Sequence, residues 1–251
     1  MTPRELLDRL AFVHRCVGCG EVLSFDESRS AFCPKCRLLW EEAKSESCKE
    51  CFREAVACTC MPKKLSKSGA LCLRKLIFYH TKKEHAPPNR LLYRLKHQPN
   101  DRLEGFVARE TAIRVREELR VLSPDNPAEQ VVLTYAPRSR RALRIEGFDQ
   151  SRRMARALSK ELSVPYVTAL ARTRGTGMQK ALSADARMKN VSKSFCCIAP
   201  NEVAGKYVLL LDDVVTTGAS MGECVSLLMR AGAKGVLCFC IAMNGSPKKK
   251  A

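Results

Sequence analysis

The amino-acid sequence predicts an α/β domain with a mostly parallel β-sheet, preceded by a small cysteine-rich module. Cysteine pairs are concentrated between residues 16 and 60. Beyond residue 71, continuously apolar segments at 130–136, 206–212 and 235–242 alternate with helix-like segments. Strands that are apolar on both faces are typical of a parallel sheet that helices cover on both sides. The 251 residues, 45% of which are hydrophobic, suffice to bury such a core.

The cysteine-rich module is assigned to residues 1–60. Its pairs are Cys16-x-x-Cys19, Cys33-x-x-Cys36, Cys48-x-x-Cys51 and Cys58-x-Cys60. Paired cysteines in a reducing compartment indicate metal ligation, and two pairs complete a four-thiolate zinc site with no open position. We expect structural zinc between the first two pairs and treat the last two as a candidate second site, because Cys-x-Cys is a tighter spacing. Redox thiols are the alternative, and His14 is an alternative ligand of the first site.

The rest of the chain is predicted to consist of a polar, basic linker at 61–70 and the α/β domain at 71–251. Strands are expected at 71–80, 130–136, 167–173, 206–212 and 235–242, and helices at 37–43, 151–162, 185–191 and 219–231. Helical spacing also extends over 89–122, with breaks near Pro99 and Gly105. Proline, aspartate and asparagine predict a loop at 123–129, and a basic loop is expected after the strand at 130–136.

The charge balance favours a polyanionic partner. The chain has 44 Lys and Arg against 26 Asp and Glu, a formal charge of +18. This excess suits nucleic acid, phosphate or a membrane surface. The longest apolar run, 236–243, is far shorter than the about 20 residues of a membrane-spanning helix. Charged residues occur within the first five positions, which argues against a secretory signal. We therefore expect a cytoplasmic protein without a membrane span.

The strongest functional signal lies at 208–220. Four apolar residues lead to Asp212 and Asp213, and small hydroxyl residues around Gly218 then precede a helix. We expect the strand to place both carboxylates at the edge of the sheet where ligands bind, beside the N–H groups that open the helix. Vicinal hydroxyls and a phosphate, as in a ribose 5-phosphate, satisfy this arrangement. A nucleotide hydrolase would also need a P-loop, and no G-x-x-x-x-G-K-[ST] sequence occurs.

This segment resembles the phosphoribosyl-pyrophosphate (PRPP) motif of the type I phosphoribosyltransferases at all 13 positions. The resemblance implies that PRPP binds here together with Mg²⁺. The carboxylates of Asp212 and Asp213 would hold the ribose hydroxyls. The 5-phosphate would be held by Thr216, Thr217, Gly218, Ala219 and Ser220.

Further segments resemble the ComF family of competence-associated proteins. They are 91–97, 136–138, Arg140-Arg141, 147–151, 170–174, Gln179, 182–183 and 187–191. A cysteine-rich zinc module ahead of a phosphoribosyltransferase-type domain is a feature of the same family. The resemblance implies a type I phosphoribosyltransferase-like fold and a role in DNA uptake during natural transformation. Single-stranded DNA is then the implied partner, and other DNA-uptake proteins are further candidates.

Two acidic residues depart from the family pattern. Glu146 and Asp149 stand where the family has arginine and asparagine. A carboxylate beside a pyrophosphate is repulsive unless a cation intervenes, and Mg²⁺, which prefers oxygen ligands, would supply that cation. The alternative is a weakened site, in which turnover is lost.

A dense run of basic residues between 138 and 160 allows two functional interpretations. Arginine suits phosphate because its planar fork donates two hydrogen bonds at once. In the first interpretation Arg138 clamps the pyrophosphate of PRPP. In the second, a nucleic-acid groove is formed by Arg140, Arg141, Arg144, Arg152 and Arg153. A solubilising basic surface remains the alternative to both.

Two functions therefore stand side by side. The first is an accessory protein that handles single-stranded DNA and keeps the PRPP pocket as a ligand sensor or a DNA-backbone site. The second is an active, Mg²⁺-dependent phosphoribosyltransferase that acts on an unidentified small-molecule acceptor. We favour the first, because the basic run and the family resemblance point to DNA.

Overall fold

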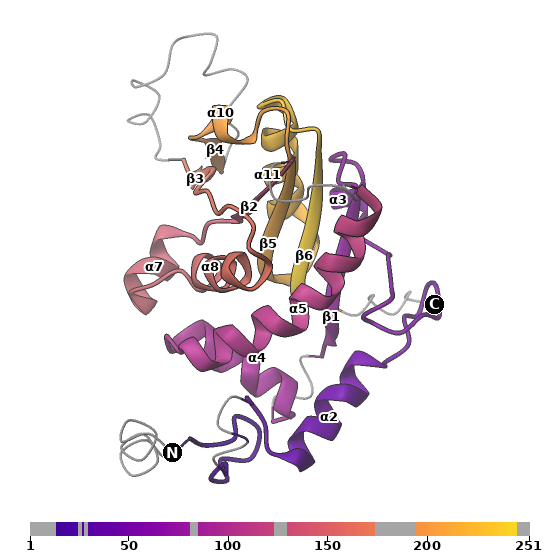
Figure 1. Cartoon of the computed structure of the whole chain (residues 1–251), viewed down its shortest axis with the longest axis vertical. Coiled ribbons are helices and arrows are strands. Elements are labelled where there is room, and N and C mark those ends of the chain that lie inside the picture. The colour runs from indigo at the N-terminus through magenta and orange to yellow at the C-terminus, as the bar shows by residue number, and fades with distance from the viewer. Residues whose placement is uncertain are drawn as a thin grey trace.

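The computed structural model describes residues 14–24, 27, 30–80, 85–122, 130–173 and 194–244. Its elements, in chain order, are α2 (Pro34–Lys44), α3 (Lys63–Ser66), β1 (Cys72–Tyr79), α4 (Pro87–His97), α5 (Asp101–Leu122), β2 (Val131–Tyr135), α7 (Arg140–Glu146), α8 (Gln150–Leu162), β3 (Leu170–Arg172), β4 (Phe195–Cys197), α10 (Pro200–Val203), β5 (Tyr207–Val215), α11 (Ala219–Arg230) and β6 (Gly235–Asn244) (Figure 1). The helix expected at 185–191, the loop at 123–129, and the family segments at 179, 182–183 and 187–191 lie outside the described residues.

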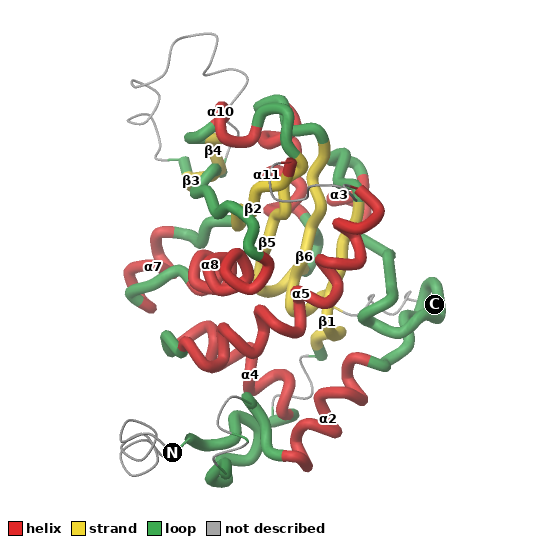
Figure 2. The backbone as a smooth tube through the Cα atoms, viewed as in Figure 1, coloured by secondary structure: helices red, strands yellow, loops and turns green. Residues whose placement is uncertain are grey.

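The central sheet has the strand order β1-β6-β5-β2, and every neighbouring pair is parallel. Successive residues of β5 face opposite cores, so that Leu209 packs with one hydrophobic cluster and Leu210 with the other. Helices α5 and α8 lie on the first face and α11 on the second (Figure 2). Both faces are therefore covered, which is why the strands read as unbroken apolar runs. The predicted parallel α/β sheet is confirmed.

The structure differs from the sequence prediction at several elements. Helix α5 runs through Gly105 without a break, because burial of neighbours such as Leu103 and Phe106 outweighs the about 1 kcal/mol that an interior glycine costs. The basic loop after β2 contains the short helix α7, capped by the Ser139 side chain, which accepts the N–H of Ala142. Strand β3 pairs antiparallel with β4, which was not predicted.

The linker at 61–70 packs tightly instead of spanning a gap. Its Leu65 is fully buried in the cluster that contains α11. A Cβ at Gly222 in α11 would lie 2.9 Å from the Lys64 carbonyl oxygen, so the two backbones approach closely. The linker therefore fixes the position of α11 and of the loop before it. The division into domains at 1–60 and 71–251 stays a prediction.

Helix α2 of the cysteine-rich module docks against α5. The rings of Phe32, Trp40 and Phe106 form a cluster with centroid separations of 5.6 to 5.7 Å. Beside it, the buried Glu110 carboxylate of α5 accepts hydrogen bonds from Arg37 (2.8 Å), Lys44 (2.8 Å) and the Trp40 indole (3.2 Å). The module thus shares a core with the α/β domain. Among the described helices, none is long and apolar enough to cross a membrane.

Candidate functional site

The PRPP motif occupies the end of β5 and the start of α11. Asp212 and Asp213 lie inside β5, which extends to Val215, and not at its last residue as the apolar run suggested. The chain then turns at Gly218, whose φ of 70° is a left-handed conformation that glycine adopts without strain. Helix α11 begins at Ala219. Thr216, Thr217 and Ser220 are exposed in this turn.

The start of α8 holds both carboxylates of the motif. The Ser151 hydroxyl lies 3.3 Å from Asp212 Oδ1, and the Gln150 side-chain amide donates to Asp213 Oδ2. Burial, with the adjacent charge of Asp213 as a second cause, raises the pKa of Asp212 well above its usual range. The carboxylates are therefore positioned from α8 before any ligand arrives.

Helix α4 contributes a cation that the sequence analysis did not single out. Lys96 Nζ lies 3.9 Å from Asp213 Oδ2, and the carbonyl of the same residue lies 3.4 Å from the Arg138 guanidinium. The family segment at 91–97 thus reaches the PRPP motif. Because Lys96 is one of several basic residues in the amphipathic helix α4, nothing in its local pattern distinguished it from a solvated lysine.

The two acidic departures from the family pattern both have partners. Asp149 caps α8 by accepting the N–H of Arg152 (3.2 Å), and it accepts the N–H of Arg138 (3.0 Å). Aspartate and asparagine are both strong N-caps, so this role survives the exchange. Burial raises the pKa of Asp149, although these N–H groups oppose the shift. Glu146 Oε1 lies 2.9 Å from His97 Nδ1 of α4. Neither carboxylate is therefore left unpaired beside Arg138.

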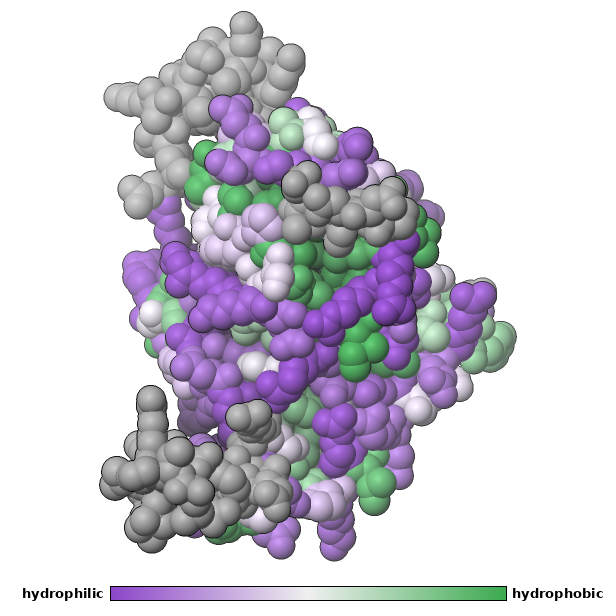
Figure 3. Space-filling view, viewed as in Figure 1, coloured by the Kyte–Doolittle hydropathy of each residue, from purple (hydrophilic) through white to green (hydrophobic). Residues whose placement is uncertain are grey.

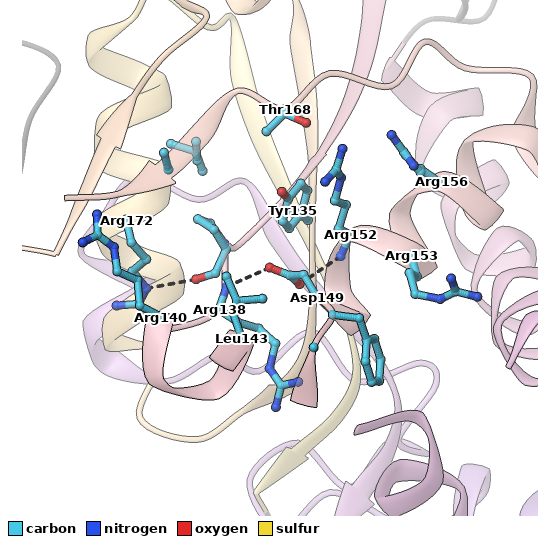
Figure 4. A pocket seen from close by; sticks show the side chains of 15 residues that line it. Tyr135, Arg138, Arg140, Leu143, Asp149, Arg152, Arg153, Arg156, Thr168 and Arg172 are labelled. Atoms are coloured by element: carbon cyan, nitrogen blue, oxygen red, sulfur yellow. Dashed lines mark hydrogen bonds between the residues drawn. The ribbon is translucent and has the colours of Figure 1, made fainter. Parts of the chain in front are cut away.

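A cavity of about 610 Å³ lies on the other side of the α8 start (Figure 4). Arginines from four segments line it: Arg138, Arg140, Arg152, Arg153, Arg156 and Arg172. In Figure 4, the first two and Arg172 lie on one side of Asp149, and the three arginines of α8 on the other. Tyr135 and Thr168 also line the cavity. Of the predicted nucleic-acid residues, Arg141 and Arg144 are exposed on α7 and do not line it.

The lining arginines differ in how far they are already engaged. Arg153 forms ion pairs with Glu104 (2.5 Å) and Asp101 (2.6 Å) of α5, so it is already engaged between two helices, and its predicted contact with nucleic acid stays a prediction. Arg172 donates to the Pro137 carbonyl (3.0 Å) and stacks 4.0 Å from the Phe195 ring centroid.

Three of the arginines that line this cavity have no polar partner within the described part of the chain. The guanidinium groups of Arg140, Arg152 and Arg156 form no hydrogen bond or ion pair there, and Arg156 lies 5.6 Å from the Tyr166 ring centroid. Figure 3 shows that the face carrying α7 and α8 is mostly hydrophilic. An anion is the ligand class that this arrangement suits, because arginine pairs readily with phosphate.

The eight cysteines of the module form two clusters. In each, the four Sγ atoms lie within 4.8 Å of one another. The first cluster is Cys16, Cys19, Cys33 and Cys36, and the second is Cys48, Cys51, Cys58 and Cys60. The Cys19–Cys33 and Cys51–Cys58 sulfur separations are 3.7 Å and 3.6 Å. A tetrahedral site with Zn–S bonds of about 2.3 Å has edges of about 3.8 Å. Both clusters therefore fit a four-thiolate metal ion.

The first loops of the two clusters repeat one backbone pattern. Gly20 and Phe52 each follow the second cysteine, and each donates its N–H to the carbonyl of the first cysteine at 2.9 Å. The N–H groups of Cys16 and Cys48 each bond a carbonyl five residues onward at 2.7 Å. The two cysteine pairs thus present their sulfurs in the same way, although the second cluster closes with the tighter Cys-x-Cys spacing.

Comparison with known proteins places these features in a family. Residues 149–251 match the model of the phosphoribosyl transferase domain. DNA utilization protein YhgH of Escherichia coli strain K12 is 31% identical over 160 residues, which cover 63% of this chain and 68% of that protein. Competence protein F of Haemophilus influenzae is 32% identical over 92 residues, or 36% of this chain and 40% of that protein. The chain belongs to the ComF family.

The ComF-family chain therefore carries a phosphoribosyltransferase-type α/β domain behind a cysteine-rich module, as the sequence predicted. Among solved structures, the allosteric regulatory enzyme of purine biosynthesis aligns with 59% of this chain and 30% of its own, at 19% identity and a TM-score of 0.37.

Proposed function

We propose that this ComF-family protein binds PRPP with Mg²⁺ at the PRPP motif and assists the handling of single-stranded DNA in the cytoplasm during DNA uptake and natural transformation. The observation that carries the proposal is the arginine-lined cavity beside the motif, in which the Arg140 and Arg152 side chains have no ion-pair partner among the described residues. Relatives whose names concern DNA utilization and competence support a role with DNA. Other DNA-uptake proteins are candidate partners.

The chemistry of the motif suits PRPP. Asp212 and Asp213 offer oxygen acceptors to vicinal ribose hydroxyls, and the turn at 216–220 offers N–H groups and hydroxyls to a 5-phosphate. The Gln150 Oε1 atom is buried beside them with no hydrogen-bond partner among the described residues. An orphaned acceptor at this place suits a ligand hydroxyl. Mg²⁺ would neutralise pyrophosphate charge, and Arg138 is the candidate pyrophosphate clamp.

DNA binding is proposed to use the cavity and the exposed face of α7. The contributing residues are Arg140, Arg141, Arg144, Arg152 and Arg156. Arg156 already lies 5.6 Å from the Tyr166 ring centroid, an arginine–aromatic pair of the kind on which bases stack. Because each phosphate contact releases counterions, affinity should fall steeply with salt.

The decisive experiment is a salt titration of fluorescent single-stranded DNA binding by the full chain, with and without Mg²⁺·PRPP. We expect Arg140→Ala and Arg152→Ala to weaken binding and to make the salt dependence shallower. Glu202→Gln, on the exposed end of α10, is the matched surface control. Absence of binding at low salt would overturn the DNA role, and absence of any PRPP-induced rise in the melting temperature would overturn the PRPP site.

An active phosphoribosyltransferase is the second candidate, and one observation favours it. Because Glu146 lies 2.9 Å from His97 and Asp149 accepts the N–H groups of Arg138 and Arg152, both acidic side chains already have partners that reduce their repulsion of a pyrophosphate at Arg138. The test is pyrophosphate release from PRPP in the presence of candidate acceptors. We expect Asp212→Asn and Asp213→Asn to abolish any release and to leave DNA binding nearly unchanged.

The module is proposed to hold structural zinc in both clusters. Four thiolates per site, with sulfur separations near a tetrahedron's edge, leave no open position for catalysis. Elemental analysis of the purified chain should return two zinc ions per molecule.

A further inference from the structure

We propose that the α/β domain supplies a cation to each cysteine cluster, Lys75 to the second and Arg102 to the first, and that these cations stabilise the metal-bound form of the clusters. The inference rests on the zinc proposal above and extends it, because it names the residues outside the ligand set that tune each site. Lys75 belongs to the edge strand β1 and Arg102 to α5.

Lys75 is a buried ammonium that faces the second cluster. Its side chain is among the largest fully buried ones, with 1% exposure. Nζ donates to the carbonyls of Cys58 (3.0 Å) and Cys60 (2.9 Å), the two residues of the Cys-x-Cys pair. Within the described ranges, no carboxylate forms an ion pair with this ammonium. A fully buried cation without a counter-charge is strongly unfavourable, so negative charge beside Lys75 would stabilise the ammonium.

A metal ion in the second cluster supplies that compensation. Four thiolates and one Zn²⁺ carry a net charge of about −2 in a tetrahedral site of this type. The negative charge is centred beside the two carbonyls that Lys75 binds. Neutral thiols would leave the ammonium uncompensated. Lys75 should therefore favour metal binding over metal release, and it also orients the Cys-x-Cys turn through both carbonyls.

The first cluster also receives a cation from the α/β domain, but from the half-buried Arg102 and not from a fully buried side chain. The Arg102 guanidinium donates to the carbonyl of Arg15 (2.9 Å), which precedes Cys16, and to the carbonyl of Ser30. Arg90 of α4 donates to the carbonyl of Gly18, inside the same cysteine loop. Among the residues that the structure describes, no carboxylate forms an ion pair with Arg102. Two clusters that differ in spacing thus receive cations on their backbone carbonyls from the same domain.

This arrangement makes metal retention depend on docking between the two parts of the chain. The control for docking alone is Arg74, the residue before Lys75 on β1. Arg74 also donates to a module carbonyl, that of Ala57 (3.3 Å), but it pairs with Glu118 and so carries its own counter-charge. Removing Arg74 weakens the attachment of the module without removing uncompensated charge.

The experiment measures zinc content and the rate of zinc transfer to the chelating dye 4-(2-pyridylazo)resorcinol from the full, zinc-loaded chain. Outer-shell residues of metal sites typically change affinity by about 10- to 100-fold. We expect Lys75→Met to weaken zinc binding at the second cluster by at least about tenfold on that scale. Arg102→Met should weaken zinc binding at the first cluster alone. The variants Cys19→Ser and Cys51→Ser, which each disable one cluster, assign the loss to a site.

Lys75→Arg separates the effect of charge from that of packing, because it keeps the cation. It should release zinc at close to the wild-type rate. Arg74→Met should also retain it. Equal zinc loss from Lys75→Met and Arg74→Met would overturn the inference, and so would unchanged retention in Lys75→Met. A wild-type chain that holds no zinc would overturn the zinc proposal itself, a result distinct from both. If Lys75→Met does not fold, Lys75→Gln takes its place. Equal zinc release from the second cluster in Lys75→Gln and Lys75→Arg would then contradict the inference.

Discussion

Phe52 occupies in the second cysteine loop the backbone position that Gly20 occupies in the first. Both residues have a positive φ, 59° for Phe52 and 83° for Gly20. Both donate the same backbone hydrogen bond. A left-handed conformation costs a residue with a side chain about 1–2 kcal/mol, which glycine avoids. The second loop is therefore held in an unfavourable conformation by its cysteines, while the Phe52 side chain is 80% exposed and returns little burial.

We expect Phe52→Gly to stabilise the zinc-loaded protein by about 0.5–1 kcal/mol. Glycine removes the strain of the left-handed conformation in the folded state. This gain exceeds the about 0.5–1 kcal/mol that glycine costs through the greater conformational entropy of the unfolded chain. Urea unfolding followed by circular dichroism measures the change. The reciprocal control is Gly20→Ala, which should destabilise by about 1 kcal/mol through the backbone alone, since a Cβ there meets nothing within 4 Å. Destabilisation by Phe52→Gly would show that the exposed ring makes an interaction that compensates the strain.

Arg152 and Arg153 are adjacent in sequence but should give opposite phenotypes. Arg153→Ala leaves the nearly buried Glu104 carboxylate without its guanidinium partner, and this should cost about 1–3 kcal/mol of folding free energy. Arg152→Ala should leave stability unchanged, weaken single-stranded DNA binding, and reduce the salt slope by about 0.7 for each phosphate that is no longer neutralised. Thermal melts and anisotropy titrations on both variants make the comparison. A larger loss of DNA affinity in Arg153→Ala, at intact stability, would contradict the assignment.

Glu110 should make docking of the cysteine-rich module sensitive to acid. Burial disfavours the charged form, but the hydrogen bond and charge of Lys44, together with Arg37, outweigh it and lower the pKa of Glu110. A carboxyl whose pKa is lowered by folding contributes stability above the ordinary value of about 4.3 and loses it as pH falls through the lowered pKa. The contribution is therefore present at neutral pH, begins to decrease as pH falls to about 4.3, and is lost below the lowered pKa.

Trp40 reports this change directly, because it is the only tryptophan of the chain and its indole donates to Glu110. We expect its emission to shift to the red on acidification as water reaches the ring. Glu110→Gln should lower stability at pH 7 and remove this part of the pH dependence. Glu117→Gln, on the exposed side of α5, is the control. An acid transition of the same size in Glu110→Gln would assign the effect to other carboxyls.

The sheet and the cysteine clusters were predictable because each has a strong local signature. Strands such as Tyr207–Val215 are apolar on both faces, and this pattern has few explanations other than a covered parallel strand. Cysteine spacing likewise limits which sulfurs can meet. Strand β4 carried no comparable signal, since three residues are too few to show a period of two.

The partners of individual charges were not predictable, because tertiary contacts decide them. Neighbouring residues on a helix point about 100° apart, so Arg152 and Arg153 face different surroundings, and no local pattern says which one meets the acids of α5. In the sequence of β1, Lys75 has the pattern of a solvent-facing residue in an alternating strand. In the structure it is buried next to the second cluster. Leu65 lies in a basic segment typical of a linker, and only the approach of α11 explains its burial.

Asp212 should make the ligand-free protein less stable as pH rises. Burial, followed by the charge of Asp213, raises the pKa of Asp212 well above the ordinary aspartate value of about 3.9. For a group whose pKa is raised by folding, the stabilising neutral form is fully present below the ordinary value and is lost as pH rises through the raised pKa. Asparagine keeps a neutral side chain at every pH. We therefore expect Asp212→Asn to melt higher than the wild type at pH 8, with a difference that shrinks towards pH 4.

The same variant should lose the PRPP-dependent rise in melting temperature, because the amide cannot replace both carboxylate acceptors for ribose hydroxyls. Differential scanning fluorimetry from pH 4 to pH 9, with and without Mg²⁺·PRPP, measures both effects in one experiment. Glu202→Gln serves as a surface carboxyl control. A stability difference that is flat with pH would remove the argument that Asp212 is held neutral by its surroundings. A higher melting point combined with an intact PRPP response would place the ribose contact on Asp213 instead. The two results separate the electrostatic cost of burying Asp212 beside Asp213 from the use of this pair in binding. A perturbed pKa of this kind is common where a site is arranged for a ligand.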